Sequence, residues 1–117
     1  MNGWQRLWRY SLALFTGRLD NYGNPLQTAA FNGDTKALDA LLEAGADINA
    51  GEPPPLHLAV FAGRAKAVRL LLERGANTDK PGLQQALAYA SRMGRLEVIE
   101  LLAEAGVKRD PNVDWNS

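Results

Sequence analysis

The feature that most constrains this sequence is an internal repeat with a period of about 30 residues. Its clearest copy contains two apolar segments, residues 55–63 (PLHLAVFAG) and 68–77 (VRLLLERGAN). Similar segments occur before it at 25–33 and 38–47, and after it at 87–94 and 99–107. Each copy predicts two short antiparallel helices. Because a unit of this size cannot bury its own apolar face, the copies are expected to stack on one another.

The predicted helices have recognisable ends. Asn24 is placed to cap a helix that begins at Pro25, and Asp34 can cap the helix that follows. Glycines end the helices at equivalent positions of the copies, and glycine readily adopts the left-handed conformation found at such ends. These glycines are Gly33, Gly63 and Gly94 after the first helices, and Gly45, Gly75 and Gly106 after the second helices.

Residues 24–106 resemble the ankyrin repeat family. The resemblance rests on Pro55-Leu56-His57-Leu58-Ala59, the stop at Gly63, the Leu70-Leu71-Leu72 run, and the segment Gly-Ala-Asp-Ile-Asn-Ala that ends at Ala50. It implies an all-α fold, a solenoid of stacked helix pairs. The family period is roughly 33 residues, so the links 45–56 and 75–87 are short and predict stunted connecting fingers. The prolines at 53–55 also disfavour a two-stranded ladder there.

This resemblance suggests an organisation for the whole chain. We expect an N-terminal capping helix or degenerate repeat at 1–22, ankyrin repeats at 23–50, 51–80 and 81–108, and a tail at 109–117. Apolar residues between Trp4 and Phe15 follow a helical period, so this segment predicts an amphipathic helix. Trp4 and Trp8 either lie buried in the cap or are exposed for docking on a partner or a membrane surface.

The composition excludes several classes of protein. Thirteen basic residues balance thirteen acidic ones, so there is no bulk charge to attract nucleic acid or an anionic membrane. The chain has no cysteine, which fits a reducing compartment. The apolar run at 12–15 is too short for a secretory signal core or a transmembrane helix. We therefore expect a cytoplasmic protein, and a monomer.

No catalytic, metal or cofactor site is predicted. His57 is the only histidine, and no carboxylate stands at helical spacing from it within its own short helix. The ankyrin resemblance implies that its imidazole hydrogen-bonds between the loops of adjacent repeats. The glycines do not form a phosphate-binding loop after a strand, and the acidic residues are scattered. We expect a protein that is not an enzyme and has neither a cofactor nor a small-molecule substrate.

Three functions fit these features. The ankyrin resemblance favours a non-catalytic module that binds a protein partner on its concave face. A dedicated inhibitor or immunity-type protein of one enzyme would look the same in sequence. Nucleic-acid binding would require a patch of arginines, although nearby acidic residues dilute it. The candidate arginines are Arg64, Arg74, Arg92 and Arg95.

A binding surface can be predicted from helical geometry. Phe31 lies five residues after Leu26, about 140° around the helix from it, so it is expected to point outward. Phe61, Arg92 and Phe15 hold the equivalent position in the other copies. In ankyrin-like proteins this position and the next one lie on the concave side; the next residues are Asn32, Ala62 and Met93. Alternatively, each phenylalanine packs against a neighbouring helix.

Charged residues also align between the second helices. Asp39, Arg69 and Glu100 are equivalent, so either neighbouring copies pair minus, plus, minus along one face or, as is more usual, these residues form a solvated outer face. Such exposed pairs contribute about 0 to 1 kcal/mol each.

Overall fold

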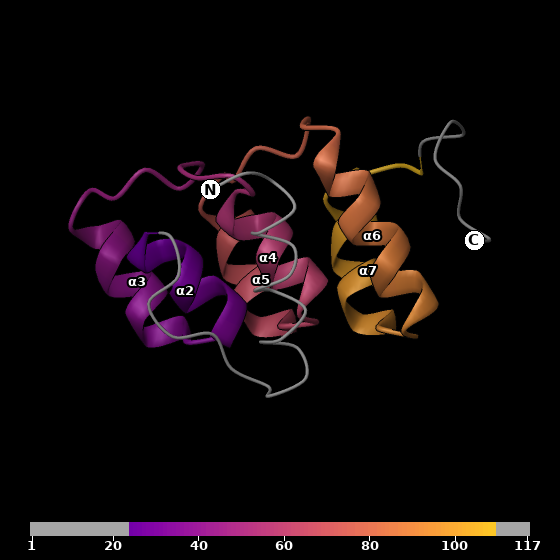
Figure 1. Cartoon of the computed structure of the whole chain (residues 1–117), viewed down its shortest axis with the longest axis horizontal. Helices are drawn as coiled ribbons and strands as arrows, with labels where there is room; N and C mark the ends of the chain where they lie inside the picture. Colours follow the sequence, from indigo (N-terminus) through magenta and orange to yellow (C-terminus); the bar gives the residue numbers. More distant parts are fainter. Residues whose placement is uncertain (1–23, 110–117) are drawn as a thin grey trace.

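A computed structural model describes residues 24–109, which form six helices in three stacked pairs (Figure 1). The pairs are α2 (Pro25–Asn32) with α3 (Thr35–Glu43), α4 (Pro55–Phe61) with α5 (Ala65–Glu73), and α6 (Gly82–Arg92) with α7 (Leu96–Glu104). No strand occurs between residues 24 and 109, which confirms the predicted all-α class. The predicted capping helix at 1–22, with Phe15, and the tail from residue 110 lie outside the described residues.

The first two helices begin at the predicted caps. Asn24 and Gln27 form a reciprocal pair: the Gln27 backbone N–H donates to Asn24 Oδ1 over 2.8 Å, and the Asn24 N–H donates to Gln27 Oε1 over 2.9 Å. Asp34 Oδ1 accepts from the backbone N–H of Ala37 at 3.0 Å. The six predicted helix-end glycines all have a positive φ, between 70° and 95°. Local sequence therefore fixes where these helices start and stop.

One core runs through all three helix pairs, within each pair and between neighbouring pairs. First helices contact first helices (α2 with α4, α4 with α6), and second helices contact second helices (α3 with α5, α5 with α7). Helix α4 is central, since all its residues from Pro55 to Val60 are buried. Buried large side chains from every pair contribute to the core: Leu26, Leu38, Leu56, Val60, Val68, Leu71, Leu83, Leu87, Val98 and Leu102. No helix in residues 24–109 is long and apolar enough to cross a membrane.

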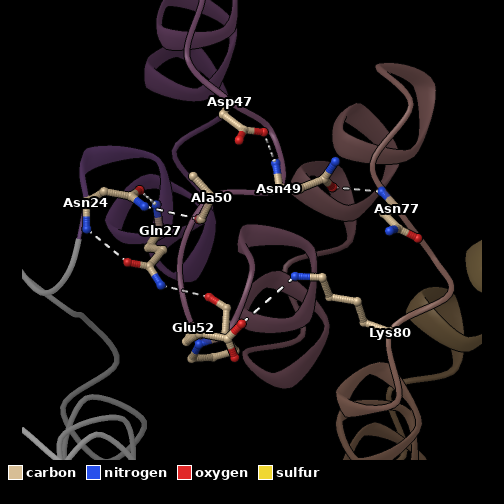
Figure 2. A network of polar contacts seen from close by, with 9 residues as sticks. Asn24, Gln27, Asp47, Asn49, Ala50, Glu52, Asn77 and Lys80 are labelled. Carbon is tan, nitrogen blue, oxygen red and sulfur yellow. Dashed lines mark hydrogen bonds and ion pairs between the residues drawn. The ribbon is translucent and has the colours of Figure 1, made fainter.

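Side chains tie the first helix pair to the loop that follows it (Figure 2). Gln27 Nε2 donates to the carbonyl of Pro53 at 2.7 Å, and Asn24 Nδ2 donates to the carbonyl of Ala50 at 3.1 Å. The backbone of Gly51 passes so close to Gln27 that a Cβ there would clash with the Gln27 amide. Only glycine therefore lets this loop lie against the start of α2.

Equivalent loops are joined by side chain to backbone hydrogen bonds, which take the place of a strand ladder (Figure 2). Asn49 Oδ1 accepts from the backbone N–H of Asn77 at 2.9 Å. Within its own loop, the Asn49 N–H donates to Asp47 Oδ1 at 3.0 Å. Lys80 and Glu52 add an ion pair at 3.9 Å. The predicted absence of a regular two-stranded ladder is confirmed within the described loops.

The predicted pairing of Asp39 with Arg69 is wrong. Asp39 instead forms an ion pair with Arg74, whose guanidinium also lies 3.3 Å from Glu43. Arg74 follows the last turn of α5, and side chains on a helix lean toward its N-terminus. The long Arg74 side chain therefore reaches back along α3. These groups are well exposed, so the pairs contribute about 0 to 1 kcal/mol.

An arginine from each later pair covers the turn of the pair before it. Arg64 lies over Gly33, where a Cβ would be only 2.8 Å from Arg64 Cδ, and its Nε donates to the carbonyl of Phe31 at 3.1 Å. Arg95 packs over Gly63 at the equivalent place, but its buried Nε makes no hydrogen bond with the described residues. Each arginine stands at the cap position before a second helix and makes no side-chain cap hydrogen bond there. These arginines therefore join neighbouring pairs.

Replacing Arg64 by alanine should lower the free energy of unfolding by about 1 to 2 kcal/mol, because a charge-assisted hydrogen bond to the Phe31 carbonyl is lost. Arg69→Ala, on the exposed side of α5, is the matched control and should change it by less than about 0.5 kcal/mol. Urea unfolding measures both. Equal effects would contradict a joining role for Arg64.

Candidate binding surface

The predicted partner-binding residues lie at one end of α2, α4 and α6. Phe61 and Arg92 are the last residues of α4 and α6, and Phe31 is the last but one of α2. The structure therefore places them in equivalent positions, as the repeat predicts. Their exposure differs from one helix pair to the next, and this decides which of them a partner can reach.

Phe31 does not point outward, so that prediction is wrong. Its side chain is 1% exposed. The argument from the helical angle assumed one buried stripe along α2. Instead, buried residues lie around most of the helix: Leu26, Gln27, Ala29, Ala30 and Phe31. A helix covered on so many sides leaves no outward position 140° from Leu26.

Phe61 packs against the neighbouring helix while remaining partly exposed. Its ring stacks on Tyr89 of α6, with ring centroids 4.2 Å apart and planes inclined by 21°. The side chain is half-buried and contacts the apolar core. The alternative of packing on a neighbouring helix is therefore correct for Phe61. A partner can reach only part of the ring.

Two smaller predicted residues offer little surface. Ala62 is 9% exposed, and Asn32 is half-buried. Together with the burial of Phe31, this removes the predicted row of exposed aromatic side chains. A contribution of Asn32 or Ala62 to partner binding stays a prediction.

The third helix pair presents the exposed part of the predicted surface. Arg92 is exposed, and Met93 is 55% exposed. Leu96, which the sequence argument missed, is 68% exposed and begins α7. Met93 and Leu96 are the large apolar side chains exposed within residues 24–109. We call residues 92–96 the third turn.

Comparing equivalent positions of the three copies could have indicated that Leu96 is unusual. Its equivalents are Ala65 and Thr35, and the equivalents of Met93 are Ala62 and Asn32. The third turn therefore carries larger apolar side chains than the two earlier turns at both positions. The helical period alone cannot distinguish an exposed leucine from a core leucine, so the signal lies in this difference between copies.

The third turn also differs in what covers it. Gly33 and Gly63 lie under Arg64 and Arg95, but no atom of residues 24–109 lies within 4 Å of the position where a Cβ of Gly94 would stand. In each of the first two turns, an arginine of the next helix pair covers the glycine. Among the described residues the third turn therefore has no such cover, and Met93 and Leu96 are exposed beside it.

The four arginines considered for nucleic-acid binding do not form one patch. Arg64 and Arg95 lie over the glycines of preceding turns, and Arg74 pairs with Asp39 and Glu43. Arg64 and Arg74 also stand at opposite ends of α5. Because phosphate binding requires several cations on one surface, this arrangement does not favour nucleic acid as the partner.

His57 is buried at 4% exposure and makes no hydrogen bond at Nε2 within the described chain. The ankyrin resemblance implied that the imidazole of His57 makes a hydrogen bond between adjacent loops. The prediction is wrong for Nε2, which makes none with the described residues. The equivalent residue of the first pair, Gln27, makes such a bond, to the Pro53 carbonyl at 2.7 Å. Sequence analysis missed Gln27, although its position thirty residues before His57 could have indicated it.

The electrostatic setting of His57 keeps its ring neutral. Burial, with a smaller effect from the charge of Lys80, lowers the pKa of His57 from 6.5 to about 4, and the charge of Glu52 opposes this change. A neutral, buried imidazole with no carboxylate partner has a packing role. In residues 24–109, no group of three or more histidine, cysteine or acidic side chains could hold a metal ion.

The lowered pKa of His57 predicts a pH-dependent stability. Below pH 6.5 the unfolded chain takes up a proton that the folded chain does not take up until about pH 4. Stability therefore falls as the pH is lowered from 6.5 to 4, by on the order of 3 kcal/mol from this group. His57→Gln, which copies Gln27, should lose less stability over this window. Urea unfolding at several pH values measures the difference, and parallel curves would contradict it.

A comparison with known protein families matches a region that includes all three helix pairs. Residues 26–114 match the family model described as "Ankyrin repeats (3 copies)". A comparison with individual curated proteins finds no match. Repeats of this family are typically protein–protein interaction modules and are usually non-catalytic, and no catalytic family matches the chain. Since the matched region is most of the sequence and coincides with the stacked helix pairs, the chain belongs to the ankyrin repeat family.

Proposed function

We propose that this chain is a non-catalytic module that binds a protein partner through the third turn. One observation carries the proposal: Met93 and Leu96, at 55% and 68% exposure, stand on either side of the uncovered Gly94. Exposed apolar side chains that lie together mark interaction sites more often than single ones do. Methionine and arginine are also enriched at protein interfaces, and Arg92 adjoins this pair.

The surface continues from the third turn toward α4. Phe61 is partly exposed and stacks on Tyr89 of α6, the helix that ends at Arg92. These residues belong to the layer of first helices, the side on which ankyrin-like proteins are expected to bind. The proposal thus keeps Phe61, Arg92 and Met93 from the predicted surface and adds Leu96. Phe31 is excluded because it is buried.

The contact energy is expected to come from a few residues. A small group of anchors usually dominates an interface, and the residues around them mainly exclude water. Met93 and Leu96 offer apolar area, whereas Arg92 offers a charged contact at the rim. Replacing both apolar side chains should therefore remove binding without removing a core contact.

The double variant Met93→Ser with Leu96→Ser should capture at least about tenfold less partner from native lysate. Its melting temperature should stay close to that of the unsubstituted protein, because both side chains are exposed. Mass spectrometry of the eluate identifies the partner, and an enzyme there would favour the inhibitor function.

Lys36→Ser with Glu73→Ser is the matched control, since both residues are exposed on second helices. It should leave capture unchanged. Equal capture by the double variant and by the unsubstituted protein would contradict the third turn as the binding surface. Phe61→Ser is a poorer probe, because loss of the Tyr89 stack lowers stability as well.

A further inference from the structure

An apolar cavity of about 170 Å³ lies between α4 and the beginning of α6. Its lining residues are Pro53, His57, Leu58, Phe61, Gly82, Gln85 and Ala86. Gly82 and Gln85 are exposed, so the cavity reaches the protein surface there. Its lining comes from α4, α6 and the loop before α4, so it belongs to the layer of first helices.

The two interfaces of the stack differ in the polar residue that stands beside this cavity. At the first interface the amide of Gln27 crosses to the following loop and binds the Pro53 carbonyl at 2.7 Å. At the second interface His57 holds the equivalent position, and its Nε2 has no hydrogen-bond partner in the described chain. Gly82, the equivalent of Gly51, comes so close that a Cβ would lie 3.1 Å from His57 Nδ1. His57 and Gly82 thus pack closely together, and both line the cavity.

The volume of the cavity matches a single aromatic ring. An apolar protein cavity of about 150 Å³ stays dry and binds benzene. Pockets for larger ligands and cofactors have volumes of about 300 to 1,000 Å³. At about 170 Å³, this cavity has room for a single aromatic ring.

The walls favour an aromatic, uncharged occupant. Phe61 is held in place by its stack on Tyr89, so its ring is a fixed partner for a second ring. Aromatic pairs gain stability beyond the area they bury. His57 is neutral at pH 7 because its pKa is lowered to about 4, and the nearby charges of Lys80 and Glu52 pair with each other at 3.9 Å. A charged group would lose its hydration there without gaining a partner.

We propose that the cavity between α4 and α6 binds one phenyl side chain of a protein partner. The proposal rests on the protein-binding function above and adds the chemistry of the partner: an exposed phenylalanine within reach of the layer of first helices. A side chain presented by a protein fits this place, because its backbone can lie along the exposed surface while only the ring enters.

The test uses the purified full chain and no partner, so its failure leaves the capture result at the third turn standing. The probe is the capped tripeptide acetyl-Gly-Phe-Gly-amide, compared with acetyl-Gly-Leu-Gly-amide and with benzene. Nuclear Overhauser contacts are recorded between the probe and the methyl groups of Leu58 and Ala86. Contacts from the phenyl ring to both methyl groups, with weaker binding of the leucine peptide, are expected.

Ala86→Leu fills the cavity and should weaken phenylalanine-peptide binding at least tenfold. Ala40→Leu adds the same atoms on an exposed position of α3 and should leave it unchanged. The contacts in the unsubstituted protein decide the question even if Ala86→Leu does not fold. Three results would overturn the proposal: no ring contact with Leu58 or Ala86, equal binding of the leucine peptide, or binding of benzene but not of the phenylalanine peptide.

Discussion

The structure depends on one constraint: a pair of helices of seven to eleven residues cannot bury its own apolar side chains. The core therefore runs through all three pairs, and α4, between α2 and α6, is buried from Pro55 to Val60. Polar contacts follow the same geometry. Gln27, Asn49 and Arg64 each bind a backbone group that belongs to a different helix pair or its loop. Stability in such a stack is approximately a sum over neighbouring units and their interfaces.

The same constraint locates the surfaces proposed to bind. Where a following unit supplies an arginine, the preceding turn is closed, as at Gly33 and Gly63. At Gly94 no such cover is present among the described residues, and large apolar side chains stand beside it. Between α4 and α6, the Nε2 of His57 makes no hydrogen bond with the described residues, and His57 lines a cavity. Both candidate sites are thus places where one copy departs from the contacts that the other copies make.

Sequence reasoning recovered the features that depend on local chemistry and failed where several units act together. Helix ends at Asn24, Asp34 and the glycines follow from capping and backbone preference, so they could be predicted. Exposure could not. Phe31 was assigned outward from a single helical angle, although its helix is buried around most of its circumference. The pairing of Asp39 with Arg74 depends on the direction in which the long Arg74 side chain extends. Aligning the copies shows which positions are equivalent but not where a side chain extends. Leu96 and Gln27 were missed because their roles appear only when the copies are compared position by position.

The central claim is that a protein partner covers the third turn, and hydrogen–deuterium exchange of the chain with and without its captured partner tests it most directly. The account predicts slower exchange of backbone amides in residues 92–97 on binding. It also predicts unchanged exchange in α3 and α5, whose exposed sides belong to the layer of second helices. Slower exchange confined to α3 and α5, with residues 92–97 unaffected, would contradict it.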